Sequence, residues 1–208
     1  MKKYSRKSNY PRQNLAGLKI QSNEVQVLIH LQGELSRQYR REVFKLLRLE
    51  NRKLFYLPLL PTYRLPLNLP RSQGENLTDL ILAAESGASF GLNELAKVFA
   101  ASDEHCFAPR LCGQVDDLLL LSDQVLRRLV ENFIQLVKHY PGRTFGLIDC
   151  DGLAFRQLAL VASLADSLSF DPNLENKGNY ASLSALENFL TKLPPKQEIF
   201  CLRPELRP

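Results

Sequence analysis

Short runs of apolar and β-branched residues alternate along this chain with longer segments whose apolar residues recur at helical spacing. The runs suited to buried strands include VQVLIHL at 25–31, KLFYLPLL at 53–60 and TFGLI at 144–148. Strands that are buried on both faces read as nearly continuous apolar runs. Their alternation with helices predicts an α/β fold: a doubly wound, mostly parallel sheet with helices on both faces.

The two longest helical segments each carry an apolar stripe. Residues 35–49 place Val43, Leu46 and Leu47 on one face. Residues 122–139 begin at Ser122, a residue type that caps helix N-termini. Their apolar face is made of Val125, Leu126, Leu129, Val130, Phe133, Ile134 and Val137. The opposite face of 35–49 is basic and forms a candidate partner surface, made of Arg37, Arg40, Arg41, Lys45 and Arg48.

Shorter elements complete the pattern. Proline cannot donate to a central ladder, so Pro58 and Pro61 are expected to end the strand at 53–60. Further helices are expected at 76–84, 91–100 and 180–192, and further strands at 105–113, 167–170 and 198–202.

Length and hydrophobic content indicate one domain. The 208 residues are 45% hydrophobic, which is enough for one sizeable core. Residues 1–15 are polar and aperiodic, so we expect a flexible basic arm followed by a single domain over 16–208. No window is apolar enough for a membrane span, and no apolar signal core follows the basic start. We therefore expect a cytoplasmic protein.

Positive charge is concentrated at the amino-terminal end. Residues 1–53 hold 13 Lys/Arg against 4 Asp/Glu, whereas residues 54–208 hold 14 against 18. Such an asymmetry suits nucleic acid, an anionic membrane surface or a solvated helix face, and these readings stay open at this point.

Three other patterns are candidates for a catalytic or metal site. Asp149–Gly152 reads DCDG, like the nucleophile motif of haloacid-dehalogenase-type phosphatases, but those enzymes carry it on their first strand. His105, Cys106 and Cys112 could join Cys150 or Cys201 around zinc, although their spacing fits no common ligand pattern. Asp116 and Asp117 are adjacent, as in a metal pair, but suit a loop before a helix better. No catalytic residue and no metal is predicted.

The order of segments resembles the ParA and MinD ATPases and, more closely, the bacterial tyrosine autokinases of capsular and exopolysaccharide synthesis. In that family a first strand enters a phosphate loop and a helix, as VLIHL enters QGELSRQYRREVFKLL here. FYLPLLPTYRLPLNLP followed by ENLTDLI matches the second strand and its Arg- and Pro-rich stretch. LLLLSDQVLRRLVENFIQLVKHYPGRTFGLID matches the helix and Walker B strand, and LALVASLADSLSF matches the next helix and strand.

The resemblance implies a P-loop fold whose phosphate loop has been lost. Gly33 and Glu34 remain, but Leu35, Ser36 and Arg37 stand where the family has Gly, Lys and Ser/Thr. Leu35 adds a branched side chain where the backbone must approach phosphate closely. We name Gly33, Glu34, Ser36 and Arg37 the relict phosphate loop.

The carboxylates of the family's metal site are also reduced. No Asp or Glu occurs between Asn51 and Gln73, and Asp149 with Asp151 is what remains at the Walker B position. Without the loop and its partners, phosphoryl transfer loses both positioning and charge stabilisation. We therefore expect no enzymatic activity and no cofactor. An alternative retains nucleotide binding, with Arg37 or Arg64 supplying the missing positive charge.

With no enzymatic activity expected, we predict a protein that acts by binding other molecules. The resemblance implies a regulatory or scaffolding subunit of an inner-membrane-associated assembly, and we expect that assembly to serve exopolysaccharide or cellulose synthesis or secretion. Its expected partners are a membrane-bound synthase, a secretion complex or a MinD-like ATPase, in a homo- or heterodimer. The alternative is a nucleic-acid-associated partition or replication protein that uses the basic amino-terminal region.

Overall fold

The computed structural model describes most of the chain between residues 12 and 203. The described residues are 12–14, 20–29, 34–60, 70, 74–110, 121–170, 188–194 and 197–203. The backbone alone is described for 12–14, 34–36, 201 and 203. Within this part of the chain, no helix has the length and apolar character needed to cross a membrane.

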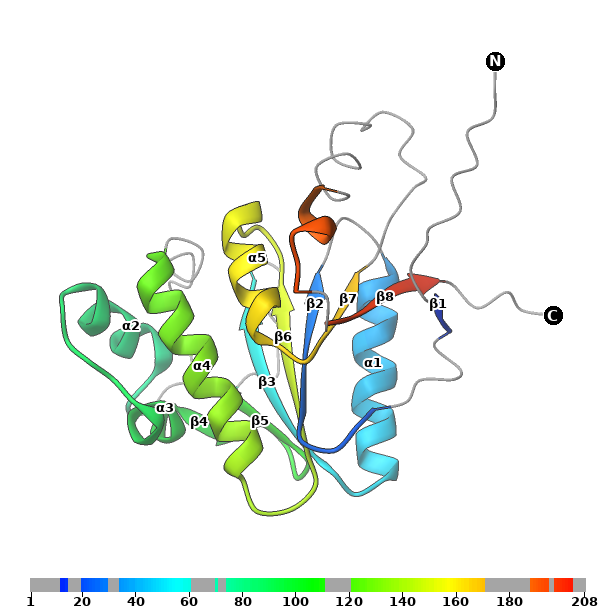
Figure 1. Ribbon diagram of the computed structural model, residues 1–208. Coiled ribbons are helices and arrows are strands. Elements are labelled where there is room, and N and C mark those ends of the chain that lie inside the picture. Colours follow the sequence, from blue (N-terminus) through cyan, green and yellow to red (C-terminus); the bar gives the residue numbers. More distant parts are fainter. Residues whose placement is uncertain are drawn as a thin grey trace.

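In the described part, an eight-stranded sheet runs through the centre of the molecule (Figure 1). Every neighbouring pair of strands is parallel except β4 with β5, so the predicted mostly parallel sheet is confirmed. In spatial order the strands are β1 (Arg12–Asn14), β8 (Glu198–Arg203), β7 (Ser167–Phe170), β2 (Glu24–Ile29), β6 (Thr144–Cys150), β3 (Lys53–Leu59), β5 (Cys106–Pro109) and β4 (Phe99–Ala101).

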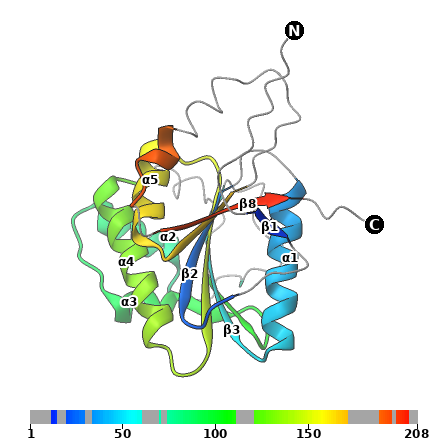
Figure 2. The same cartoon turned by 45° about the vertical axis from the view of Figure 1, so that its right-hand side comes forward.

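Helices cover both faces of the sheet, as predicted (Figure 2). Among the described helices, α1 lies alone on one face, and the others pack on the opposite face around α4. The helices are α1 (Glu34–Leu49), α2 (Leu77–Glu85), α3 (Leu92–Val98), α4 (Asp123–His139) and α5 (Phe155–Leu164).

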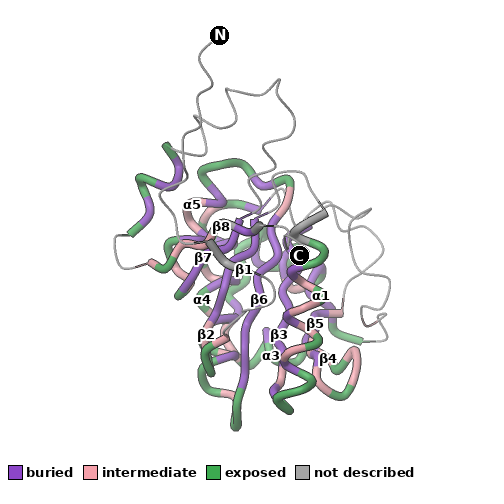
Figure 3. The backbone as a smooth tube through the Cα atoms, turned by 90° about the vertical axis from the view of Figure 1, so that its right-hand side faces the viewer, coloured by how far each residue is buried: buried purple, intermediate pink, exposed green. Residues whose placement is uncertain are grey.

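The core is deepest around β6, where all seven residues are buried (Figure 3). Gly146 lies at the middle of this strand, beneath α4. A Cβ atom there would lie 2.8 Å from Val137 Cγ2 and 2.9 Å from Val25 Cγ2, closer than packed carbons approach. The absence of a side chain therefore allows α4 to sit directly on the sheet.

Helix α4 agrees closely with its prediction. The Ser122 hydroxyl accepts a hydrogen bond from the Val125 N–H at 3.4 Å, and the helix ends at His139. Its predicted apolar stripe is buried throughout, namely Val125, Leu126, Leu129, Val130, Phe133, Ile134 and Val137.

Two short strands depart from the sequence expectations. Residues 12–14, assigned to the flexible arm, form β1, because their backbone pairs in parallel with Cys201–Arg203 of β8. Residues 99–101 form β4 where the pattern predicts the end of a helix, since α3 stops at Val98 and Phe99 turns to extended backbone. A pairing partner outside the segment decides each case: β8, which is distant in sequence, for β1, and β5, which follows within ten residues, for β4.

Pro58 was expected to end its strand but lies inside β3, opposite Asp149 of β6. The Leu54 N–H donates to His105 just before β5, so the backbone N–H positions of residues 54, 56 and 58 face the β5 side. Strand β5 pairs only with Leu54 and Phe55, so no ladder bond is lost at Pro58. The proline is tolerated because its missing N–H faces beyond the end of β5.

Buried polar groups tie α1 to the sheet near β2 and β7. The Tyr39 hydroxyl donates to Gln26 Oε1, and Gln26 Nε2 donates to Ser167 Oγ at 3.1 Å. Ser167 Oγ in turn donates to Glu24 Oε1. Buried polar side chains cost free energy when they lack hydrogen-bond partners. This series of hydrogen bonds therefore favours one position of α1 on the sheet.

Arg52, at the amino ends of the strands, is the largest fully buried side chain among the described residues. Its Nη1 donates to the Ile20 carbonyl at 2.7 Å and to Glu50 Oε2 at 3.0 Å. Its Nη2 donates to the Gln21 carbonyl. Arg52 thereby fastens the segment before β2 to the start of β3.

Candidate functional site

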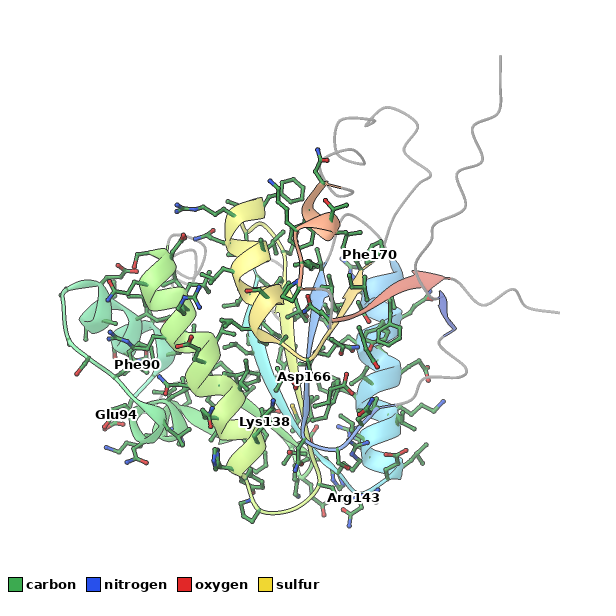
Figure 4. All side chains as sticks on the ribbon, in the orientation of Figure 1. Phe90, Glu94, Lys138, Arg143, Asp166 and Phe170 are labelled. Carbon is green, nitrogen blue, oxygen red and sulfur yellow. The ribbon has the colours of Figure 1, made fainter. Side chains whose placement is uncertain are left out.

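The carboxyl ends of β2, β6 and β3 lie side by side in the middle of the sheet. In Figure 4, Phe170 marks the carboxyl end of β7, and Arg143 marks the opposite edge of the sheet, just before the amino end of β6. Beyond β2 the chain enters α1 on one face, whereas beyond β6 it enters α5 on the other. Doubly wound sheets bind ligands where successive connections leave to opposite faces. Asp149, one residue before the end of β6, lies at this point.

Only part of the relict phosphate loop falls within the described residues. Gly33 lies outside them, and Glu34 and Ser36 belong to the first turn of α1, where the backbone alone is described. Arg37 is exposed in the same turn. Arg64 also lies outside the described residues. The roles of these residues toward nucleotide therefore stay predictions.

Asp149 is the centre of a buried polar cluster on the α1 side of the sheet. Its Oδ2 accepts hydrogen bonds from the Tyr56 hydroxyl at 2.6 Å and from Arg40 Nη1 at 2.9 Å. Arg40 Nη1 also lies 3.2 Å from the Tyr56 oxygen. Asp149 is fully buried, and the Arg40 side chain is 20% exposed. Three elements, α1, β3 and β6, thus supply one ion pair and a hydroxyl donor.

The protonation states in this cluster follow from burial and neighbouring charge. Burial raises the pKa of the Tyr56 hydroxyl, and the nearby Asp149 carboxylate raises it further. Burial acts to lower the pKa of the Arg40 guanidinium, but Tyr56 and Asp149 outweigh that effect and raise it. At neutral pH both groups therefore keep their protons and donate to Asp149.

The geometry disfavours the phosphatase reading of DCDG. A nucleophilic carboxylate must reach an incoming phosphate, whereas Asp149 has no exposed surface and is occupied by Tyr56 and Arg40. Asp151 follows the strand; its backbone N–H donates to the Leu59 carbonyl at 3.0 Å. Gly152 then adopts φ +79°. The motif is the end of β6 followed by a bend at Gly152, which leads the chain toward α5.

The neighbouring strand brings no second carboxylate to Asp149. In the register of β3 with β6, Pro58 stands opposite Asp149 and Leu59 opposite Cys150. Leu59 and Leu60 are both buried. The carboxyl end of β3 is therefore apolar and supplies no metal-supporting carboxylate.

The basic face of α1 is largely where the sequence placed it. Arg37, Arg41, Lys45 and Arg48 are exposed. Arg48 Nη2 pairs with Asp103 at 2.5 Å, and Lys45 lies 3.8 Å from Glu42.

Arg40 was predicted to belong to the partner surface, but this prediction is wrong. Its side chain points toward the sheet and pairs with Asp149. A signal for this was present in the sequence, since Arg40 lies three residues before Val43 and seven before Leu47, both of which are buried. Tyr56 could have been found in the same way, because it alternates with Leu54 on a buried strand. Nothing in the sequence indicated that both would meet Asp149.

No zinc site assembles from the described residues. Cys106 packs on the α1 side of the sheet and Cys150 on the α4 side, so the two thiols cannot share an ion. Both are free and buried, and burial raises the pKa of Cys106 to about 11. No group of three potential ligands occurs in the described part. The other residues weighed as ligands lie outside it or have no described side chain: Cys112, Asp116, Asp117 and Cys201.

Comparison with known proteins finds likeness in structure alone. No family model matches the sequence, and no curated protein matches it. The kinase domain of the Escherichia coli tyrosine kinase ETK matches with a TM-score of 0.58 and 13% identity, over 89% of this chain and 69% of that one. A ParA family ATPase from Chlorobium tepidum matches with a TM-score of 0.57 and 12% identity, over 87% and 73%.

A plasmid partition protein from Borrelia burgdorferi matches with a TM-score of 0.52 and 13% identity, over 89% of this chain and 80% of that one. The class is therefore defined by its architecture: this chain has the P-loop NTPase-like α/β fold of ParA-type ATPases and bacterial tyrosine kinase domains. The expected fold class is confirmed, and several of the proteins that share it are named as ATPases or kinases.

Proposed function

We propose that this chain is a non-catalytic member of the ParA/MinD-like fold, acting as a regulatory or scaffolding subunit through protein contacts. The observation that carries this proposal is the pairing of Asp149 with Arg40. The carboxylate at the Walker B position is buried and already faces a cation of its own chain at 2.9 Å.

Chemistry at a P-loop requires charges that are available to the nucleotide and its metal. A magnesium ion is held there by carboxylate and hydroxyl oxygens and by several waters. Asp149 is fully buried, so neither the ion nor its waters contact the carboxylate. Moving Arg40 away would leave a buried carboxylate without its cation, which is costly. The arrangement favours a role for Asp149 in holding α1 against β6.

The sequence around the sheet edge agrees with this proposal. Leu35 and Ser36 stand in the phosphate loop where the family has Gly and Lys, and Pro58 and Leu59 end β3 without a carboxylate. Each departure removes a different requirement of phosphoryl transfer: close backbone approach, charge neutralisation and metal support. No cofactor belongs to the proposal.

The assembly we propose is bacterial and associated with the inner membrane, with exopolysaccharide or cellulose synthesis or secretion as the first choice. This follows from the resemblance to the polysaccharide tyrosine autokinases. Its partners would be a membrane-bound synthase, a secretion complex or a MinD-like ATPase, in a homo- or heterodimer. The chain itself would be cytoplasmic and peripheral to the membrane.

Titration calorimetry with ATP and with GTP, each with Mg²⁺, tests the non-catalytic proposal. We expect no binding heat at millimolar nucleotide. Micromolar binding would contradict the proposal and favour the alternative in which Arg37 supplies the missing charge. In that event Arg37→Ala should weaken binding and the exposed control Arg41→Ala should leave it unchanged.

The second candidate function is nucleic-acid association, which the exposed cations of α1 favour. Phosphate contacts release counterions, so the affinity would fall steeply between about 50 and about 200 mM salt. Binding of a DNA duplex with that salt dependence, lost on reversing the charges of Arg41 and Lys45, would support this candidate. Weak binding that is independent of those residues would remove it.

A further inference from the structure

The exposed cations of α1 form a single file along the helix. Arg37, Arg41, Lys45 and Arg48 are spaced by four, four and three residues, so they fall within about 80° of arc. From Arg37 to Arg48 the file is about 16.5 Å long, with two successive axial steps of about 6 Å and a last step of about 4.5 Å. We call these four residues the basic stripe.

The stripe faces away from every described helix. α1 packs its opposite side on the sheet through Tyr39, Val43 and Leu47, and the other described helices lie beyond the sheet (Figure 2). Lys45 pairs with Glu42 and Arg48 pairs with Asp103, but these ion pairs are exposed and contribute little free energy. A partner's carboxylates can exchange with them at small cost.

An apolar side chain stands at the end of the stripe. Leu49 is 76% exposed, the highest value among the exposed large hydrophobic residues of the described part. It follows Arg48 directly and lies about 40° around the helix from Lys45. A partner that covers the stripe therefore gains free energy by covering Leu49 as well.

Glu42 decides between kinds of partner. It borders the stripe beside Lys45, and its side chain is 43% exposed. A uniformly anionic polymer would meet repulsion there and gain nothing from Leu49, and an anionic membrane surface would meet the same repulsion from Glu42. A protein segment can place an acidic file against the stripe, a neutral or basic residue against Glu42 and an apolar residue against Leu49.

We infer that the basic stripe docks an acidic α-helix of a partner protein, with carboxylates at positions i, i+4, i+8 and i+11 and an apolar residue at the end facing Leu49. Two helices that run side by side in the same direction share the same rise per residue, so all four charge pairs meet at once. Arginine forms bidentate contacts with carboxylates, which adds geometric preference. This inference rests on the proposed function, because it names the partner that a scaffolding subunit would engage.

The test uses the full chain and two synthetic helical peptides of equal composition. The striped peptide carries four glutamates in the spacing above and a terminal leucine; the scattered peptide distributes the same residues around its helix. Fluorescence anisotropy should show the striped peptide binding at least about tenfold more tightly. Equal affinity for the two peptides, or no binding of either, overturns the inference.

Charge reversal identifies the surface. Arg41→Glu with Lys45→Glu should abolish binding, and a peptide with lysines at the two facing positions should restore it. The matched control, Arg127→Glu with Lys97→Glu, makes the same change of net charge on the opposite side of the sheet and should bind as the wild type does. Loss of binding in the control, or no rescue by the lysine peptide, overturns the inference.

Competition experiments distinguish an acidic helix from nucleic acid and from an anionic membrane as the partner. A short DNA duplex and phosphatidylserine vesicles should displace the striped peptide weakly; tighter binding of either one overturns the helix partner. These outcomes are distinct from failure of the proposed function. Nucleotide binding in the calorimeter would contradict the non-catalytic role while leaving the peptide result intact.

Discussion

Arg40 and Arg41 are adjacent in sequence and occupy opposite environments. Arg40 is 20% exposed and pairs with buried Asp149, whereas Arg41 is exposed on the outer side of α1. One step along a helix turns a side chain by about 100°, which is enough to separate core from solvent. The same residue type therefore serves the interior at one position and a partner surface at the next.

Removing the Arg40 charge should destabilise the fold. Arg40→Met leaves Asp149 buried without its cation, which should cost about 3 kcal/mol or more of unfolding free energy. Urea unfolding followed by circular dichroism measures the loss. The exposed control Arg41→Met should stay within about 0.5 kcal/mol of the wild type.

Removing both charges distinguishes an ion pair from simple packing. Arg40→Met with Asp149→Asn keeps an acceptor for the Tyr56 hydroxyl and should recover much of the stability lost in Arg40→Met alone. If the double variant were as unstable as the sum of the two single variants, the assigned pairing would be wrong.

Glu24 predicts a pH dependence of stability. Burial raises the pKa of this carboxyl above 4.5, although the Ser167 hydroxyl and a backbone N–H act to lower it. Between 4.5 and the raised value the folded chain binds more protons than the unfolded chain. The contribution of Glu24 to stability is therefore present below that window and is lost as pH rises through it.

Unfolding free energies measured from pH 4 to pH 8 check this sign. The wild type should lose stability with rising pH relative to Glu24→Gln, which cannot titrate at this position. If the stability of the wild type relative to Glu24→Gln instead increased with rising pH, the predicted direction would be wrong.

At the scale of elements, the packing of α4 on the sheet depends on Gly146. A Cβ atom at this position meets Val137 of α4 and Val25 of β2 at under 3.0 Å. Gly146→Ala should therefore destabilise the fold by about 1–3 kcal/mol through overpacking. Thermal unfolding gives the loss, and adding Val137→Ala should make the double variant less unstable than the two single effects predict. Strict additivity would mean that Val137 is not the colliding group.

Across the whole molecule, β1 closes the edge of the sheet beside β8. Residues 12–14 pair with 201–203 although almost the entire chain lies between them. Deleting residues 1–14 should expose the edge of β8 and promote self-association, with each lost ladder bond contributing about 0.5–1.5 kcal/mol. Light scattering compares this deletion with the deletion of residues 1–9, which keeps β1 and should remain like the full chain.

Much of this architecture could be predicted from the sequence because local patterns encode it. Strand and helix order, the parallel sheet, the Ser122 cap and the buried stripe of α4 depend on hydrophobic periodicity and on residues close together in the chain. The basic stripe was also predictable, since helical spacing alone places its four members on one face. Asp149 could be singled out by its place after an apolar run.

Tertiary structure decided everything that depends on residues distant in sequence. The capture of Asp149 by Tyr56 and Arg40 joins positions 93 and 109 residues apart. Pro58 is tolerated inside β3 because β5 ends before it, and β1 exists because β8 offers it an edge. A single sequence records which side chains are polar or apolar, but not which of them meet. The pairing that distinguishes a structural carboxylate from a metal-binding one is therefore visible only in the folded molecule.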